Sequence, residues 1–138
     1  MEMISNPNNL RIRVVPMPKD TNASGNIFGG WIMSQIDIAG SLATQDLNPG
    51  EVVTIAVNSL EFRESVKVGD ILSLYAKIIK VGSTSIQTKV EVYAERMINF
   101  KRACLHVTSA IATYVAVDID GKKRVFKKDE TILKELGL

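Results

Sequence analysis

The segment from Gly29 to Gln45 constrains the fold more than any other stretch, because it is apolar on nearly every side. From Trp31 to Leu47 the hydrophobic residues recur at helical spacing, which predicts one long helix. The segment contains no Lys, Arg or Glu, and Asp37 is its single charged residue. A helix with so little polar surface must be covered on most sides, so we expect the rest of the chain to wrap around it.

Asp37 is the strongest functional lead in this helix. An ionised carboxylate is costly to bury unless it is paired or hydrogen-bonded, and no basic residue lies within one helical turn of it. A carboxylate that instead borders a cleft suits a general base or a nucleophile. A capped or water-bound structural aspartate is the alternative interpretation.

Gly29 and Gly30 stand immediately before the predicted helix. Without side chains, they would let a ligand atom approach backbone N–H groups that the helix start directs outward. The pair therefore predicts an oxyanion hole, although a plain loop-to-helix turn would need the same residues.

Composition predicts a single small domain. The 138 residues, 46% of them apolar, are enough for one core and too few for two, so we expect one domain over 1–138 with flanking tails at 1–9 and 127–138. No stretch has the roughly 20 apolar residues of a membrane span, and the first residues lack a signal pattern, so we expect no membrane insertion and a cytoplasmic location. A net charge of +2 argues against a general nucleic-acid partner. Basic residues gather at Lys101-Arg102 and again over 122–128. They form either a solvated surface or a site that attracts a phosphorylated ligand.

Cys104 and His106 are the only residues of their kinds, which excludes an internal disulfide and makes a zinc site unexpected. They stand at alternate positions of one strand-like run and so share one face of it. We expect packing residues there rather than a Cys-His catalytic pair, because no third partner is apparent.

The remaining pattern is that of strands. Alternating or β-branched runs predict strands over 10–15, 52–63, 71–81, 84–95 and 105–118. Asn48-Pro49-Gly50 is a turn signal that ends the helical region, and Gly82-Ser83 makes a tight turn between two strands. Residues 127–138 indicate a short amphipathic helix or a partly ordered tail. This order predicts an α+β fold, an antiparallel sheet wrapped around one long central helix. The helix is too apolar for one sheet face alone, so we also expect a second subunit against it.

Several segments of the chain resemble one known family, the hotdog-fold acyl-CoA thioesterases, and within it the YciA-type bacterial acyl-CoA hydrolases. The matching segments are Met17–Ala23, Gly25–Met33, Asp37, Val52–Thr54, Glu61-Phe62, Val68-Gly69-Asp70, Val81-Gly82, Thr84-Ser85 and Thr113–Asp118. The spacing of the Asn-containing loop, the Gly-Gly step and the helix Asp is more specific than any of the three alone.

This resemblance implies a hotdog fold, hydrolysis of acyl-CoA to a free acid and CoA without a metal or other cofactor, and homodimers that assemble into hexamers as trimers of dimers. It matches Asp37 to the catalytic carboxylate, Asn22 to the loop amide that works opposite it, and the Gly30 N–H to the group that polarises the thioester carbonyl. It implies CoA or substrate contacts at Gly29, Gly82, Ser83, Thr84 and Ser85, with Asn58 and Ser59 as weaker candidates.

Two other classes remain open. A hotdog-fold lyase or dehydratase would usually need a His beside the acid, and His106 is far from the helix motif in sequence. A non-catalytic acyl-CoA-binding sensor would normally carry a DNA-binding segment, for which the chain shows no pattern.

Overall fold

The computed structural model describes residues 2–138, and its main elements follow the predicted order of one strand, one long helix and four long strands. The strands are β1 (Leu10–Val14), β2 (Val52–Phe62), β3 (Ile71–Val81), β4 (Ser85–Ile98) and β5 (Lys101–Ala116), and the long helix is α2 (Gly29–Thr44). The shorter elements are α1 (Glu2–Ser5), α3 (Glu130–Glu135) and the 3-10 turns η1 (Pro7–Asn9), η2 (Pro18–Asp20) and η3 (Gln45–Leu47). The strands form one antiparallel sheet in the order β1-β3-β4-β5-β2.

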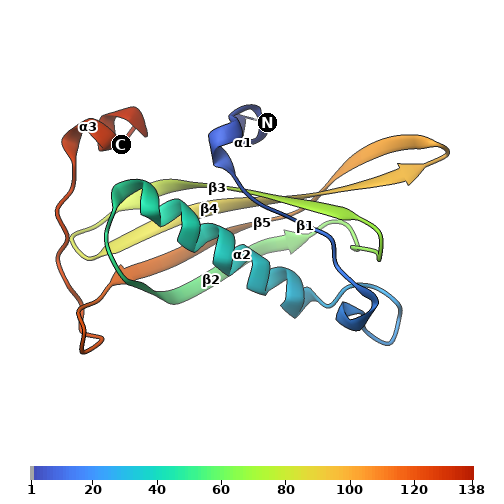
Figure 1. Cartoon of the computed structure of the whole chain (residues 1–138), viewed down its shortest axis with the longest axis horizontal. Helices are drawn as coiled ribbons and strands as arrows, with labels where there is room; N and C mark the ends of the chain where they lie inside the picture. The colour runs from blue at the N-terminus through green and yellow to red at the C-terminus, as the bar shows by residue number, and fades with distance from the viewer. Residues whose placement is uncertain (1) are drawn as a thin grey trace.

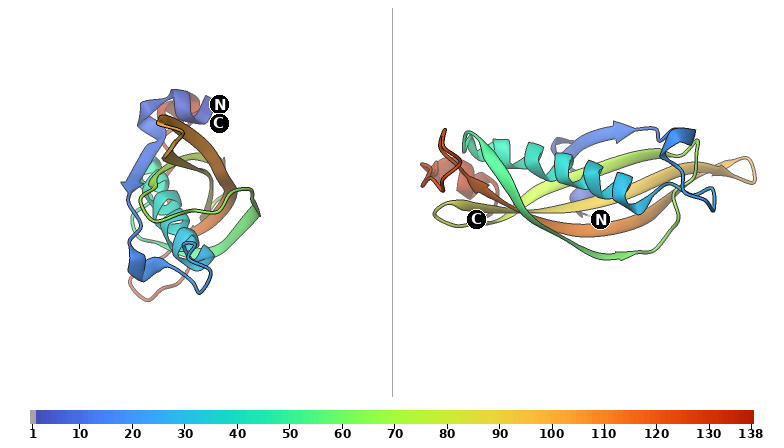
Figure 2. Two further views of the ribbon diagram at one scale, coloured as in Figure 1. Left: turned by 90° about the vertical axis from the view of Figure 1, so that its right-hand side faces the viewer. Right: turned by 90° about the horizontal axis from the view of Figure 1, so that it is seen from below.

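Helix α2 lies along one face of the curved sheet (Figures 1 and 2). Its inward side carries Ile32, Ile36, Ala39 and Ala43, which are buried. They pack against six buried sheet residues: Leu72, Leu74, Val90, Val92, Val107 and Ala110. Each fully buried Val, Leu or Ile side chain contributes about 1.5–3 kcal/mol, so this layer is the main source of stability.

Gly40 allows the helix to approach the sheet closely. A Cβ atom at this position would lie 2.7 Å from the Thr88 hydroxyl oxygen and would also overlap the Tyr114 hydroxyl. The helix could then not remain at its present distance from β4 and β5.

The outward side of α2 is not covered within the single chain. Ile38 and Leu42 are 47% and 43% exposed, and the neighbouring edge strand β2 exposes Val53 and Ile55 at 40% and 58%. We call these four residues the open apolar face. An exposed apolar patch of this kind marks an interaction surface.

The β4–β5 hairpin is longer than predicted. We expected the strands to stop at Glu95 and to resume at Leu105, but β4 runs to Ile98 and β5 starts at Lys101. A two-residue turn joins them, with Asn99 and Phe100 both at positive φ. Beyond the body of the sheet both faces of the hairpin meet water, so the hydrophobic alternation that marks a strand disappears there.

The C-terminal segment forms a shorter helix than the predicted range. Helix α3 spans Glu130–Glu135, and the Asp129 side chain caps it by accepting hydrogen bonds from the backbone N–H groups of Thr131 and Ile132. Ile132 and Leu133 of this helix, with Leu136 just after it, pack on a second small core at the end of the sheet.

Candidate active site

The start of helix α2 presents unpaired backbone N–H groups. The helix begins at Gly29, so the prediction that Gly29 and Gly30 precede it was wrong: they are its first two residues. Glycines carry no side chain, so hydrophobic periodicity cannot show that the helix has already started at them. First-turn N–H groups have no intrahelical partner. Among residues 2–138, neither glycine N–H has an acceptor, and a Cβ at either position would meet nothing within 4 Å. A ligand atom can therefore reach both donors.

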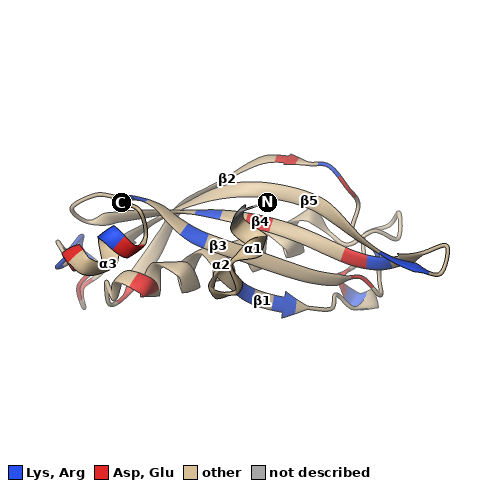
Figure 3. Ribbon diagram, turned by 90° about the horizontal axis from the view of Figure 1, so that it is seen from above, with Lys and Arg blue, Asp and Glu red and all other residues tan. Residues whose placement is uncertain are grey.

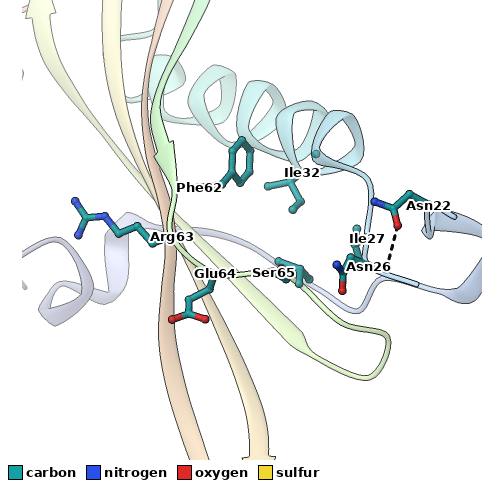
Figure 4. Close-up of a pocket in the computed structure, with 10 residues that line it drawn as sticks. Asn22, Asn26, Ile27, Ile32, Phe62, Arg63, Glu64 and Ser65 are labelled. Carbon is teal, nitrogen blue, oxygen red and sulfur yellow. Dashed lines mark hydrogen bonds between the residues drawn. The ribbon is translucent and has the colours of Figure 1, made fainter. Parts of the chain in front are cut away.

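Asn22 lies in a tight loop beside this helix start. Its Oδ1 accepts hydrogen bonds from the Ser24 N–H at 3.0 Å, the Ser24 hydroxyl at 2.7 Å and the Asn26 N–H at 3.2 Å. The side-chain amide nitrogen points away from this turn (Figure 4). Because the oxygen is fully engaged, the NH₂ group is the part of Asn22 that remains available to a ligand.

A pocket of about 280 Å³ opens between the Asn22 loop, the first turns of α2 and the segment that follows β2 (Figure 4). Its apolar lining consists of Ile27, Ile32, Phe62 and Val66. Polar atoms come from Asn22, Asn26, Arg63, Glu64 and Ser65, together with the backbone of Gly29. Apolar walls with a few convergent polar groups are typical of a small-molecule site.

Asp37 lies about 12 Å further along α2 than Gly29 and does not line this pocket. Its Oδ1 accepts hydrogen bonds from the Thr54 hydroxyl at 2.8 Å and from the Tyr114 hydroxyl at 3.1 Å. The Tyr114 hydroxyl also donates to the Asp37 backbone oxygen at 2.6 Å, so its single proton is shared between this oxygen and Oδ1. Among residues 2–138, no donor reaches Oδ2, so one carboxylate oxygen is held and the other is free to accept a proton or attack a carbon.

Tyr114 remains a hydrogen-bond donor in this arrangement. Burial raises the pKa of its hydroxyl far above the ordinary value, and the Asp37 charge and hydrogen bond raise it further. A phenol that stays protonated at every working pH holds the carboxylate in one orientation.

Thr54 and Tyr114 were not predicted as site residues. They are opposed neighbours in the β2–β5 register, which brings both toward α2. Each stood in a segment that carried the family resemblance, at Val52–Thr54 and Thr113–Asp118, and that was the only signal that could have found them.

The predicted CoA-binding residues lie elsewhere. Gly82, Ser83, Thr84 and Ser85 form the β3–β4 turn, at the end of the sheet opposite the start of α2 (Figure 1). The Gly82 N–H donates to the Ser85 backbone oxygen at 2.8 Å, and the Lys128 ammonium donates to the Ser83 backbone oxygen at 2.6 Å. The turn is therefore next to Lys128, the last basic residue of 122–128, whereas the basic pair Lys101-Arg102 lies on the distant β4–β5 hairpin (Figure 3).

Asn58 and Ser59 lie on β2, apart from the other predicted CoA-binding residues of the Gly82–Ser85 turn. Asn58 is exposed, and the Ser59 hydroxyl contacts the Thr108 hydroxyl at 3.2 Å. The chain thus holds three separate clusters of predicted site residues: the Asn22 and Gly29–Gly30 pocket, the Asp37 carboxylate, and the Gly82–Ser85 turn.

His106 is engaged on the other face of the sheet. Val90 and Val92 point into the core toward α2, so Glu91 between them points away from it. The His106 Nε2 lies 2.6 Å from Glu91 Oε2, and the Ser109 hydroxyl donates to the same oxygen. Burial raises the pKa of the Glu91 carboxyl, but the hydrogen bonds from Ser109 and His106 outweigh it and leave the pKa below its ordinary value.

The described chain contains neither a cluster of metal ligands nor a membrane-spanning helix. Within residues 2–138, His, Cys, Asp and Glu side chains form no group of three that could hold a metal ion. No helix in the same range has the length and apolar character that a membrane crossing requires.

The class of protein follows from comparison with known families. The thioesterase superfamily model matches residues 24–101, which include Gly29, Gly30, Asp37 and Thr54, and the chain belongs to this superfamily. Its relatives define a narrower group within it. Acyl-CoA thioester hydrolase YciA of Salmonella typhimurium is 43% identical over 116 residues, which cover 83% of this chain and 87% of the relative. The YciA protein of Escherichia coli is 40% identical over 116 residues, covering 83% and 88%.

Solved structures agree on the fold. A hexameric hotdog fold thioesterase of Campylobacter jejuni superimposes with a TM-score of 0.85 and 46% identity, covering 94% of this chain and 97% of its own. A hexameric broad specificity acyl-coenzyme A thioesterase, solved as an Asp-to-Ala variant, gives a TM-score of 0.83 and 40% identity, covering 92% and 93%. The predicted fold is confirmed: an α+β hotdog fold.

Proposed function

We propose that this chain hydrolyses the thioester of acyl-CoA to a free acid and CoA, with Asp37 as general base or nucleophile. The observation that carries the proposal is the Asp37 carboxylate, with Oδ1 bound by Thr54 and Tyr114 and Oδ2 without a donor among residues 2–138. Curated relatives that cover most of the chain are acyl-CoA thioester hydrolases, which supports the same reaction.

Two routes use these residues. As a general base, Asp37 takes a proton from water, the resulting hydroxide adds to the thioester carbonyl carbon, and the C–S bond breaks as the thiolate gains a proton. As a nucleophile, Asp37 forms an acyl anhydride with release of CoA, and water then cleaves the anhydride. In both routes negative charge develops on the carbonyl oxygen, where the Gly30 N–H and the Asn22 amide are the proposed donors. Neither route calls for a metal or a cofactor.

The complete site requires two subunits in this proposal. The Gly30 N–H is separated from Asp37 by about two turns of α2, and Asn22 lies in the loop before the start of that helix. The open apolar face beside Asp37 offers the surface on which a second copy can pack. We therefore place Asn22 and Gly30 of one subunit opposite Asp37 of its partner. Solved relatives that are described as hexameric support a homohexamer. We propose that its subunits are arranged as a trimer of such dimers.

The CoA phosphates are proposed to bind near the β3–β4 turn. The Lys128 ammonium already contacts the Ser83 backbone oxygen, and further cations follow along 122–128. These charges give Gly82, Ser83, Thr84 and Ser85 the electrostatic setting that a nucleotide phosphate needs.

Release of free thiol from acyl-CoA tests the proposal, measured for wild type and Asp37→Asn over a range of acyl lengths. The substitution keeps the size of the side chain but removes its basicity, so turnover should fall by about 100-fold or more with the fold intact. Asp120→Asn, in an exposed loop, is the matched control and should keep wild-type turnover. An Asp37→Asn enzyme with more than about a tenth of wild-type turnover would rule out the base or nucleophile role.

The other two classes give different results in the same assay. A lyase would consume the double bond of an enoyl-CoA without releasing thiol, and a sensor would bind acyl-CoA without changing it. The structure offers a lyase no His beside Asp37, since His106 is bound to Glu91 on the far face of the sheet. We therefore favour the hydrolase.

A further inference from the structure

Two loops form facing walls of the pocket at the start of α2. Residues 63–70 connect β2 to β3 and supply Arg63, Glu64, Ser65 and Val66. Residues 21–28 precede α2 and supply Asn22, Asn26 and Ile27. The geometry of the pocket thus depends on how these two loops are held.

The first loop is held from β4 by an ion pair between Arg96, whose side chain is partly exposed, and the buried Asp70. One guanidinium nitrogen of Arg96, Nη2, donates to the Ser65 backbone oxygen at 2.8 Å and to Asp70 Oδ2 at 2.7 Å. Asp70 is only 2% exposed, and its Oδ2 also accepts from the Lys67 backbone N–H at 2.9 Å. Within the described residues 2–138, Arg96 Nε is buried and has no hydrogen-bond partner. Loss of the Arg96 cation would leave the buried Asp70 carboxylate uncompensated, so this contact restrains the loop.

The first loop in turn holds the second. The Ile27 backbone N–H donates to the Val66 oxygen at 2.9 Å, and the Lys67 ammonium donates to Asn26 Oδ1. The Asn26 N–H donates to Asn22 Oδ1 at 3.2 Å. A continuous series of hydrogen bonds therefore runs from Arg96 through Ser65–Lys67 to the Asn22 loop.

We propose that Arg96 is a positioning residue for the hydrolase: by fixing residues 63–70 it sets the placement of Asn22 and of the first N–H groups of α2. This inference rests on the proposed function, because those groups are the proposed oxyanion donors. Arg96 does not itself line the pocket, so it acts through the two loops. Donors for a developing oxyanion must be held within about 0.5 Å of the productive geometry, and a misplacement of about 1 Å can reduce the rate about 100-fold.

Arg96→Met tests the proposal because it keeps most of the aliphatic stem and removes both hydrogen bonds. Arg96→Lys keeps a positive charge that can reach Asp70. Its kcat and loop exchange rates should therefore lie between those of wild type and those of Arg96→Met. Arg13→Met is the matched control, since Arg13 pairs at 2.8 Å with Glu95, the residue beside Arg96, but contacts neither loop. All variants are full-length chains in their native assembly.

Hydrogen exchange measured by mass spectrometry reports the loops directly. In Arg96→Met, exchange should accelerate in both 63–70 and 21–28, and stay at the wild-type rate in β3 and in the second half of α2. With acyl-CoA, kcat should fall about 10- to 100-fold. KM should change less than about threefold, because the proposed phosphate-binding turn at Gly82–Ser85 lies at the other end of the sheet. Arg96→Lys should recover part of kcat, and Arg13→Met should match wild type in both measurements.

Three results would overturn the proposal: acceleration restricted to 63–70, acceleration spread evenly over the whole chain, or an unchanged kcat in a variant whose two loops both open. If Arg96→Met does not fold, Arg96→Lys and Asp70→Asn carry the same comparison. Failure of the proposed function has a separate signature. Wild type would then release no thiol, while the exchange data would still show whether Arg96 controls the Asn22 loop.

Discussion

The Thr54 hydroxyl donates to Asp37 Oδ1 at 2.8 Å, and the residue opposite Thr54 in the β2–β5 register, Tyr114, donates to the same oxygen. Two adjacent strands therefore orient the one carboxylate of the central helix. The orientation leaves Oδ2 directed away from both donors and available for chemistry.

We expect Thr54→Val to lower kcat about tenfold, because a hydrogen bond to a charged group contributes about 1.5 kcal/mol and that energy corresponds to one decade in rate. Turnover of an acyl-CoA substrate and the thermal midpoint should be measured together. Thr113→Val, one residue before Tyr114 on β5, is the control and should retain activity, since its hydroxyl has only a 3.4 Å contact with Gln87. Full turnover in Thr54→Val would remove Thr54 from the site.

Mixed dimers test the shared active site. Inactive Asp37→Asn and inactive Asn22→Ala chains, unfolded together and refolded, should combine into heterodimers that hold one intact site and one doubly altered site. Equal mixing makes about half of the dimers mixed, so activity should return to about a quarter of wild type. If mass spectrometry detects the mixed dimers while activity stays at the level of the parents, the site lies within one chain.

Salt should weaken CoA binding more than it slows hydrolysis. Screening of the cations near Ser83 raises KM with ionic strength and leaves kcat nearly unchanged, because the reacting groups are remote from that turn. Lys127→Gln, on the exposed surface of this cluster, should raise KM and reduce its salt dependence. Lys101→Gln on the distant hairpin is the control. A flat KM across the salt range would place the phosphates elsewhere.

Stability should decrease in acid partly through Glu91. Because the folded-state pKa of this carboxyl is lowered, its contribution is present above its unfolded value of about 4.5 and is lost as the pH falls through the folded pKa. Glu91→Gln should therefore be less stable than wild type at pH 7, and the difference in unfolding free energy should shrink below about pH 4. Urea denaturation at several pH values measures this difference. A gap that stays constant into acid would contradict the role of Glu91.

Local patterns in the sequence were sufficient to predict the framework of the fold. The helical spacing of apolar residues defined α2, alternation defined the middle of each long strand, and Asn48-Pro49-Gly50 ended the helical region, where Asn48 and Gly50 indeed adopt positive φ. Asp37 stood out because one charge in an apolar helix is visible without any structure. The start of α2 and the tip of the β4–β5 hairpin were misplaced, since neither position has a hydrophobic face to reveal its period.

By itself, therefore, the sequence determined the element order and the α+β class, because helix period and strand alternation are properties of neighbouring residues. It also singled out Asp37 as a lone charge, while most of the other candidate site residues came from the family resemblance. Only the tertiary structure decided which of those residues meet. The register of β2 against β5 brought Thr54 and Tyr114 to Asp37, and the approach of 63–70 to β4 paired Asp70 with Arg96. The length and rigidity of α2 kept Asn22 apart from Asp37 within one chain. Such contacts join residues distant in the chain, and their geometry is set by sheet register and helix packing, which no local pattern encodes.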